Sequence, residues 1–194
     1  MCLLSQIKTY YRKHNADRIV QGDILREVKF SDWDWDTEKN NVIIYEKNLP
    51  YVVILTQDCD LEQDFKYRTT TVKNNDKILQ SILVCPAYGW EDFTKGDHLK
   101  DFELKMEVIT SDKKKLIRTQ QVPRFHYLEE DSESQTPALV IDFKHYYTLP
   151  VEFLRHIYIK HYVSSMNELF RESLSQRFSF YLSRIGLPEI KKVG

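Results

Sequence analysis

Continuous apolar runs are the clearest pattern along this chain. Residues 51–55 read YVVIL and residues 80–88 read QSILVCPAY, and both runs contain several β-branched side chains. A short apolar run without alternation is typical of a strand that is covered on both of its faces. The pattern therefore predicts two strands in the interior of a sheet, the second of which ends at Pro86.

Shorter apolar segments predict four further strands. They are residues 18–30, where Gly22 and Asp23 interrupt the pattern, and residues 41–46, 123–128 and 138–149. Asn48–Pro50 predicts a turn between the strands at 41–46 and 51–55. Residues 31–41 read SDWDWDTEKNN, and this acidic, turn-rich composition predicts a loop.

Apolar residues recur at helical spacing near the end of the sequence, between Ser165 and Ile185. The positions are Met166, Leu169, Phe170, Leu174, Phe178, Tyr181, Leu182 and Ile185. Ser165 followed by Glu168 matches a capping box, and Gly186 with Pro188 is typical of a helix end. Two shorter segments are also considered: residues 91–105 predict a short helix, and Lys113–Arg118 predicts a hairpin or an exposed helix end.

Composition favours a folded, soluble domain rich in β-structure. Of the 194 residues, 42% are hydrophobic and 13% are aromatic, mainly Tyr and Phe, which are enriched in strands. The net charge of −1 gives no whole-chain attraction to nucleic acid. No apolar run approaches the ~18–20 residues of a membrane span. The three cysteines, Cys2, Cys59 and Cys85, suit a reducing compartment, so we expect a cytoplasmic protein.

Together these elements predict a mainly β (α+β) fold, a small β-barrel with inserted loops and a long C-terminal helix. We expect residues 1–163 to form the barrel domain and residues 164–194 to form the helix that packs on it.

Three strings resemble the barrel of the MazF/PemK-type toxins. They are QGDIL at Gln21–Leu25, LPYVVILTQDCD at Leu49–Asp60 and ILVCPAY at Ile82–Tyr88, all within residues 18–90. The resemblance implies an SH3-like barrel and, for that family, ribosome-independent endoribonuclease activity in toxin–antitoxin systems. Leu49 stands where the family has its catalytic arginine, and Pro86 and Ala87 stand where it has its catalytic Ser or Thr. The resemblance therefore extends to the barrel and not to the active site.

A second resemblance is to an uncharacterised bacterial family. It rests on TQDCDL at Thr56–Leu61, on Asp142-Phe143 and on the segment Arg177–Pro188. Such proteins resemble accessory components of mobile-element or phage-defence loci, and the resemblance implies no activity.

The polar cluster after the first buried strand is the leading candidate site. It consists of Thr56, Gln57, Asp58, Cys59 and Asp60. Polar groups at a strand end are often used for binding. In an extended strand, Asp58 and Asp60 share one face and Cys59 points into the core. The two carboxylates then either cap a turn or hold a cation with a third carboxylate, Glu62 or Asp142.

A second candidate site combines histidines with Asp142. His126 and His145 lie in predicted strands, and pairing of those strands brings both rings near Asp142 as acid–base groups. Hydrogen bonding within the sheet is the ordinary alternative for such histidines. The candidate binding residues are therefore Thr56, Gln57, Asp58, Asp60, Asp142 and His145. No metal or cofactor is expected, because no ligand motif is present.

Basic and aromatic residues interleave at 113–127 and at Leu154–Tyr162, a composition used to bind single-stranded RNA. A solvated basic edge accounts for them equally well. Arg171, Arg177 and Arg184 likewise form either a phosphate-binding stripe or ion pairs along a helix.

Two functional hypotheses follow. The first is a non-catalytic interaction or regulatory module of a bacterial stress-response or phage-defence system. It binds a protein encoded nearby, or RNA or DNA, across the mouth of the barrel. The alternative is a divergent MazF/PemK-like endoribonuclease that uses Arg26 or Arg124 with His126 as acid–base groups. Either protein is compatible with a homo-oligomer, and no membrane contact is expected.

Overall fold

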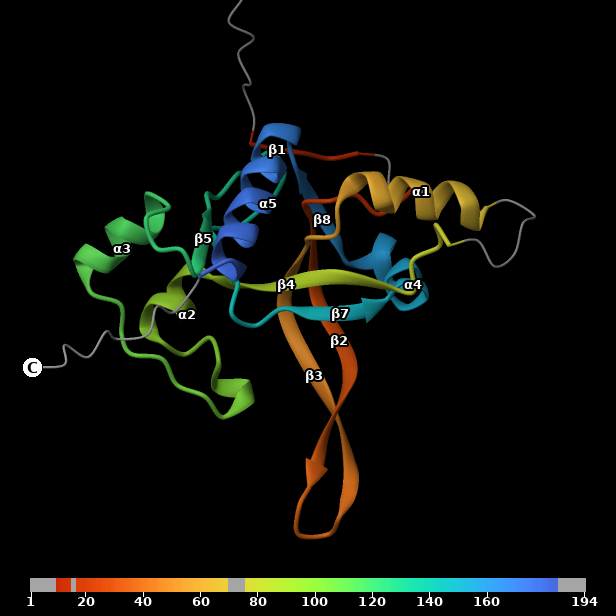
Figure 1. Cartoon of the computed structure of the whole chain (residues 1–194). Coiled ribbons are helices and arrows are strands. Elements are labelled where there is room, and N and C mark those ends of the chain that lie inside the picture. Colours follow the sequence, from red (N-terminus) through yellow and green to blue (C-terminus); the bar gives the residue numbers. More distant parts are fainter. Residues whose placement is uncertain (1–9, 15–16, 70–75, 185–194) are drawn as a thin grey trace, which may run out of the picture.

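An antiparallel β-sheet forms the centre of the protein in the computed structural model, which describes residues 10–14, 17–69 and 76–184 (Figure 1). The strands are β1 (Tyr11–Arg12), β2 (Asp23–Asp36), β3 (Asn41–Ile54), β4 (Ser81–Gly89), β5 (Phe125–Leu128), β6 (Leu139–Asp142), β7 (Tyr147–Pro150) and β8 (Tyr162–Met166). They hydrogen-bond in the order β1-β8-β2-β3-β4-β6-β5, and β7 pairs with the beginning of β4. The sheet curls into a half-barrel with helices around it, which confirms the mainly β (α+β) prediction.

Helices cover both faces of the curled sheet. In chain order they are α1 (Asp58–Arg68), α2 (Trp90–Lys95), the short 3₁₀ helix η1 (Lys100–Phe102), α3 (Ser111–Arg118), α4 (Val151–His161) and α5 (Glu168–Leu182). One hydrophobic cluster joins the strands to α1 and α4 through Leu61 and Leu154. A second joins them to α5 through Leu174 and Phe178. A third cluster, around Phe93, holds α2 and α3 at one end of the sheet.

The apolar run at residues 51–55 lies between two of these clusters. Val52 and Ile54 belong to the cluster with α1 and α4, whereas Val53 and Leu55 belong to the cluster with α5. Successive side chains of a strand point to opposite faces, so a strand buried on both faces is apolar at every position. The predicted interior strand is confirmed. The strand predicted from residues 80–88 is confirmed as β4, although it continues past Pro86 to Gly89.

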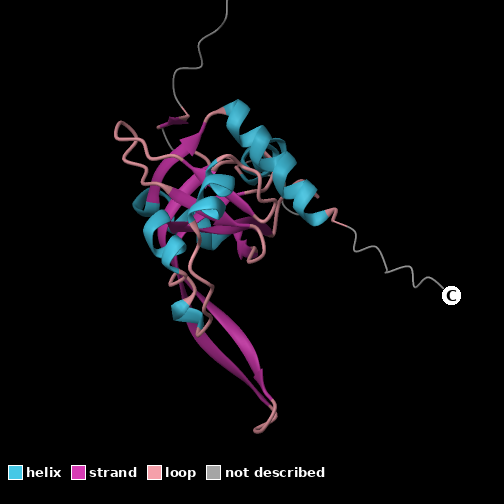
Figure 2. Cartoon of the chain, turned by 90° about the vertical axis from the view of Figure 1, so that its left-hand side faces the viewer, coloured by secondary structure: helices cyan, strands magenta, loops and turns pink. Residues whose placement is uncertain are grey.

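Strands β2 and β3 continue beyond the body of the protein as a two-stranded arm, which we define as residues 29–48 (Figures 1 and 2). The strands remain paired as far as Asp36 and Asn41. The loop predicted at residues 31–41 is therefore wrong, because most of that segment belongs to the end of β2.

Pro50 lies within β3, so the turn predicted at Asn48–Pro50 is also wrong. Proline has no N–H to donate to a neighbouring strand, and within sheets it is confined to edges and irregular positions. Near Pro50, Glu27 takes a positive φ of 54°, and the pairing resumes with Val28 opposite Leu49. A single irregular position thus lets the strand pass through proline.

The helix predicted from Ser165 begins later than expected. Ser165 and Met166 are the last residues of β8, and Asn167 is the N-cap of α5, so the predicted capping box does not form. Ser165 is fully buried and donates a hydrogen bond to Asp23, which holds it in the sheet. The expected domain boundary at 163/164 falls inside β8. The predicted stop at Gly186 and Pro188 lies outside the described residues.

Other predicted elements change their type or their bounds. The strand predicted to begin at residue 18 begins at Asp23 and is β2. Residues 138–149 contribute to two strands, β6 and β7, rather than one. The basic and aromatic segment at residues 154–161 belongs to helix α4. Lys113–Arg118 lies within α3, which settles the alternative in favour of a helix. Residues 91–105 contain most of α2 and all of η1.

Gly96 is required by both its backbone angle and its surroundings. It ends α2 with a positive φ of 84°, and a Cβ at this position would lie 2.1 Å from the carbonyl oxygen of Met106. We expect Gly96→Ala to lower the free energy of unfolding by about 2 kcal/mol or more, measured by urea denaturation. Gly89→Ala is the matched control, because its nearest neighbour would be 4.0 Å away. Equal stability of the two variants would contradict this explanation.

Candidate functional site

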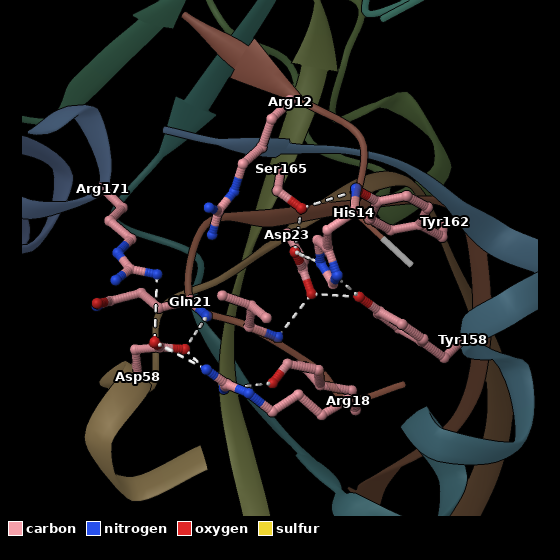
Figure 3. A network of polar contacts seen from close by, with 12 residues as sticks. Arg12, His14, Arg18, Gln21, Asp23, Asp58, Tyr158, Tyr162, Ser165 and Arg171 are labelled. Atoms are coloured by element: carbon pink, nitrogen blue, oxygen red, sulfur yellow. Dashed lines mark hydrogen bonds and ion pairs between the residues drawn. The ribbon is translucent and has the colours of Figure 1, made fainter. Parts of the chain in front are cut away.

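A fully buried carboxylate lies where β2 begins. Asp23 accepts hydrogen bonds from Ser165 Oγ at 2.5 Å, from Tyr158 Oη at 2.5 Å and from the backbone N–H of Val20 at 2.6 Å. His14 Nε2 lies 3.2 Å from the same carboxylate (Figure 3). Both carboxylate oxygens therefore have protein partners, from the segment before β2, from the segment after β1, from α4 and from β8.

Burial and the Asp23 carboxylate together change the pKa of Tyr158. Burial, together with the charge of Asp23 and the hydrogen bond to it, raises the pKa of Tyr158 far above its ordinary value. Tyr158 therefore stays protonated and remains a donor. The Tyr162 hydroxyl lies 2.9 Å from Ser165 Oγ and extends the network by one side chain.

A second carboxylate, Asp58, joins this network to α1 and α5 (Figure 3). Arg18 donates two hydrogen bonds to it, at 2.9 and 3.1 Å, and Arg171 of α5 lies 3.3 Å away. Burial raises the pKa of Asp58, but the hydrogen bonds from Arg18 and the charges of both arginines outweigh it and lower the pKa below the ordinary value. Gln21, between the two carboxylates, donates to Leu55 O and Ser175 Oγ. Asp58 thus holds α5 against the start of α1.

The polar cluster after β3 does not have the geometry expected from an extended strand. Residues from Asp58 onward are helical, so Asp58 and Asp60 do not share a strand face. Cys59 is exposed on the helix, and its predicted place in the core is wrong. Asp60 is exposed as well, and Gln57 is the N-cap of α1. Thr56 Oγ1 accepts a hydrogen bond from Leu83 N at 2.7 Å, which is a structural contact.

Asp142 lies in a separate cluster at the end of β6. Arg124 donates to both of its carboxylate oxygens, at 2.8 and 2.5 Å, and His145 Nε2 lies 3.8 Å away. Burial lowers the pKa of His145, so its ring is neutral near pH 7. The structure therefore brings Asp142, Arg124 and His145 together. Within the described residues, no hydrogen bond or ion pair joins them to Asp58.

His126 is not part of the Asp142 cluster. It pairs with Ile141 across β5 and β6, whereas Asp142 pairs with Phe125, so the His126 and Asp142 side chains point to opposite faces of the sheet. The His126 ring is 2% exposed, and its Nε2 lies 3.4 Å from the hydroxyl of Tyr10. The expected approach of His126 to Asp142 is therefore wrong.

The remaining candidate arginines are Arg177 and Arg184, which contact other groups of the protein, and Arg26, which is exposed. Arg177 donates to the carbonyl groups of Gln120, Val122 and Phe125 and so holds α5 to the start of β5. The Arg184 guanidinium lies 3.8 Å from the ring centre of Tyr181. The Arg26 side chain is exposed near the base of the arm. The predicted arginine stripe is thus divided among separate contacts.

The arm carries the largest group of exposed apolar side chains in the described part of the chain. Trp33 lies opposite Ile44, and Trp35 lies opposite Val42, so the four share one face. Their exposed fractions are 65, 73, 49 and 50%, respectively. Three aspartates, Asp32, Asp34 and Asp36, alternate with the tryptophans on the other face. We call the face with Trp33, Trp35, Val42 and Ile44 the arm face.

A lysine cage holds the base of the arm to the body. Lys47 Nζ lies 2.5 Å from an Asp32 oxygen and within 4.8–5.5 Å of the ring centres of Tyr45, Phe102 and Tyr147. Burial lowers the pKa of Lys47, but the hydrogen bond to Asp32 and neighbouring negative charges raise it overall, so the lysine stays charged. A desolvated ammonium over aromatic faces is a favourable contact. The arm is therefore attached at its base although its face is uncovered.

A groove runs from the arm base along β7. Its volume is about 760 Å³. Aromatic and apolar side chains that line it are Phe30, Trp33, Tyr146, Tyr147, Pro150 and Phe153. The polar residues Lys29, Ser31, Asp32, Glu46 and Thr148 complete most of the lining, and Trp33 places the groove beside the arm face.

Sequence reasoning missed both the arm face and the centre of the polar network. The strict alternation in Asp32–Asp36 was the available signal, because period-two alternation is typical of a half-buried strand. The acidic, turn-forming composition of the same residues favours a loop instead. No comparable local signal pointed to Asp23, whose partners Tyr158 and Ser165 are 135 and 142 residues away.

Fold and surface together define an α+β half-barrel protein with a buried network of hydrogen-bonded carboxylates and an uncovered apolar arm. The chain matches no known protein family, no curated protein and no solved structure. Among the described residues, no group of three or more His, Cys, Asp and Glu side chains is arranged to hold a metal ion. No helix in that same part of the chain has the length and apolar character needed to cross a membrane.

The Asp23 network is expected to contribute to stability. Tyr158→Phe removes one donor and leaves an oxygen of a buried carboxylate short of a hydrogen bond, which costs about 1–3 kcal/mol. Thermal denaturation should show a lower Tm, and the exposed Tyr146→Phe serves as the control because the Tyr146 hydroxyl makes no hydrogen bond to any described residue and its ring packs edge-on against Phe178. A Tyr158→Phe variant as stable as the control would show that the network contributes nothing measurable.

His126 is expected to make the fold sensitive to acid. Burial, with a smaller contribution from Arg177, lowers its pKa to about 3, and burial lowers the pKa of His98 to about 4. The unfolded chain binds protons on these rings below about pH 6.5, whereas the folded chain does not. The contribution of these two neutral histidines to the free energy of unfolding is therefore fully present above about pH 6.5. It is lost as the pH decreases from there towards 3.

The slope of this loss provides the measurement. One histidine contributes at most about 1.4 kcal/mol per pH unit to the free energy of unfolding. Urea denaturation between pH 7 and pH 4 should therefore show a shallower loss for His126→Leu than for the wild type. Parallel pH profiles would mean that His126 does not remain neutral in the fold.

Proposed function

We propose that this protein is a non-catalytic interaction module that binds a protein partner through its arm face. The observation that carries the proposal is the exposure of Trp33, Trp35, Val42 and Ile44 on an element that projects from the body. Apolar patches of this kind on a folded protein mark interaction sites, and tryptophan is enriched among the residues that dominate binding energy.

Charge on the arm supports a protein partner over nucleic acid. Asp34 and Glu38 near the tip make no ion pair among the described residues, and Asp36 has only Lys39 at 3.7 Å. A phosphate backbone is repelled by such a tip. The partner therefore presents an apolar surface flanked by basic groups, which complements both the face and the tip of the arm.

The polar clusters support a binding role over catalysis. Asp23, Asp58 and Asp142 are each hydrogen-bonded to protein donors, and their partners belong to the frame of the fold. His126, the acid–base candidate of the endoribonuclease alternative, is buried and bonded to Tyr10, and Arg124 is held by Asp142. These contacts give that alternative no support.

We also propose a specific type of barrel for the curled sheet. We interpret the curled sheet as an SH3-like barrel related to that of the MazF/PemK-type toxins, supported by the antiparallel succession β2-β3-β4 over residues 23–89. A role in a bacterial stress-response or phage-defence system, with the partner encoded nearby, is the biological setting that we propose for the module.

Capture with matched variants tests the arm. The double variant Trp33→Ser/Ile44→Ser removes the centre of the arm face, and Phe180→Ser removes an apolar side chain of similar exposure on α5. A partner captured by the wild type and by Phe180→Ser should be lost by the double variant. Calorimetry with the purified partner should then show an affinity at least about tenfold weaker for the double variant.

Circular dichroism checks that the variants are folded. We expect them to fold because the substituted residues lie outside the three core clusters. Undiminished binding of the purified partner by a folded double variant would overturn the proposed function. Binding of RNA or DNA oligonucleotides that depends on the arm would replace the protein partner with a nucleic acid.

A further inference from the structure

The arm has opposite charge at its two ends. At the tip, Glu38 is exposed and makes no ion pair within the described residues. At the base, Arg26 of β2 and Lys160 of α4 are exposed and likewise make no ion pair in that part of the chain. His161 Nδ1 lies 2.8 Å from the carbonyl oxygen of Arg26, which places the end of α4 beside the arm base. The arm therefore runs from a basic base to an acidic tip.

The surface between these two ends is rich in exposed apolar side chains. It comprises the arm face and, beside Trp33, the groove along β7, whose lining also includes polar side chains such as Lys29. Along the arm, β2 and β3 pair only with each other among the described strands, and the N–H groups of Trp33 and Trp35 are hydrogen-bonded to the side chains of Asp32 and Asp34.

We infer that the arm binds a second copy of this chain, in an antiparallel pair that sets the acidic tip of each arm against the basic base of the other. This inference rests on the proposed function and names the partner. An apolar surface with opposite charges at its ends is complementary to itself once it is turned through 180°. The tip then meets Arg26 and Lys160 of the other copy, and the two arm faces cover each other and the grooves.

A specific dimer needs a large contact area. A stable interface buries about 1,000 Å² or more in total, and the arms of both copies take part in this one. A specific interface usually has aromatic residues such as tryptophan at its centre and charged residues at its rim. A membrane is a poorer occupant, because anionic lipid headgroups repel the acidic tip.

Light scattering on the purified full-length chain tests the inference. Between about 1 and about 100 µM, the range of micromolar affinity, the wild type should approach twice the 23.3 kDa mass of one chain. Trp33→Ser/Trp35→Ser should raise the dimer dissociation constant at least about tenfold, whereas Phe180→Ser should leave it unchanged. Circular dichroism and Tm show whether the variants remain folded.

A charge exchange tests the antiparallel arrangement. Glu38→Arg alone, or Arg26→Glu alone, places like charges together and should weaken the dimer about tenfold. The combined variant Glu38→Arg/Arg26→Glu restores opposite charges and should recover the affinity of the wild type. Failure of the combined variant to recover would overturn the antiparallel arrangement, even if the tryptophan variant is monomeric.

The outcomes separate this inference from the proposed function. A wild type that stays monomeric up to 100 µM would overturn the second copy as partner, as would a dimer that the tryptophan variant leaves intact. If a monomeric wild type still binds a different purified protein through Trp33 and Ile44, the proposed function stands and only the inference is lost. If neither kind of binding depends on the arm, both are wrong.

Discussion

The buried carboxylate of Asp23 is the constraint on which the arrangement of the body depends. A charge removed from water is tolerated only when several donors surround it. Those donors come from Val20, His14, Tyr158 and Ser165, which belong to four different parts of the chain. The carboxylate is therefore satisfied only when β8 and α4 have reached the start of β2. A neighbouring carboxylate, Asp58, ties α1 and α5 to the same place.

This arrangement determines where the core of the sheet ends. Val28 and Leu49 are the last fully buried pair of the β2–β3 ladder. Beyond them no helix covers the strands, and a two-stranded ribbon alone is at best marginally stable in water. The cage around Lys47 attaches the ribbon at its base, where Asp32 supplies the counter-charge. Farther out, the tryptophans have only cross-strand neighbours and remain in contact with water.

The contrast between the two regions supports the proposed roles. In the body, buried carboxylates have hydrogen-bond donors, so the polar clusters hold the fold together. On the arm, large apolar side chains lack the cover that such residues normally have. A binding partner would bury these side chains, and the charges along the arm determine which partner is complementary to it. Function is thus expected at the arm and not at the polar strand end that stands out in the sequence.

Local pattern by itself determined the class of the fold. The unbroken apolar runs around Val53 and Val84 predict interior strands, because strand periodicity and double burial leave a mark within a few residues. The same reasoning failed where the deciding contacts are distant. Residues 31–36 extend because β3 pairs with them, although their composition suits a loop. Asp58 begins a helix held by Arg18 and Arg171, contacts that the run of polar letters does not reveal.

The division between sequence and tertiary structure has a single physical reason. Periodicity reports which face of an element is apolar, and it needs only neighbouring residues. The surroundings of a polar group are decided by elements far away along the chain, as for Asp23 with Tyr158 and Ser165. The sequence therefore determined that strands such as β4 are buried. Only the tertiary structure decided that Asp23 is satisfied and that the arm is left uncovered.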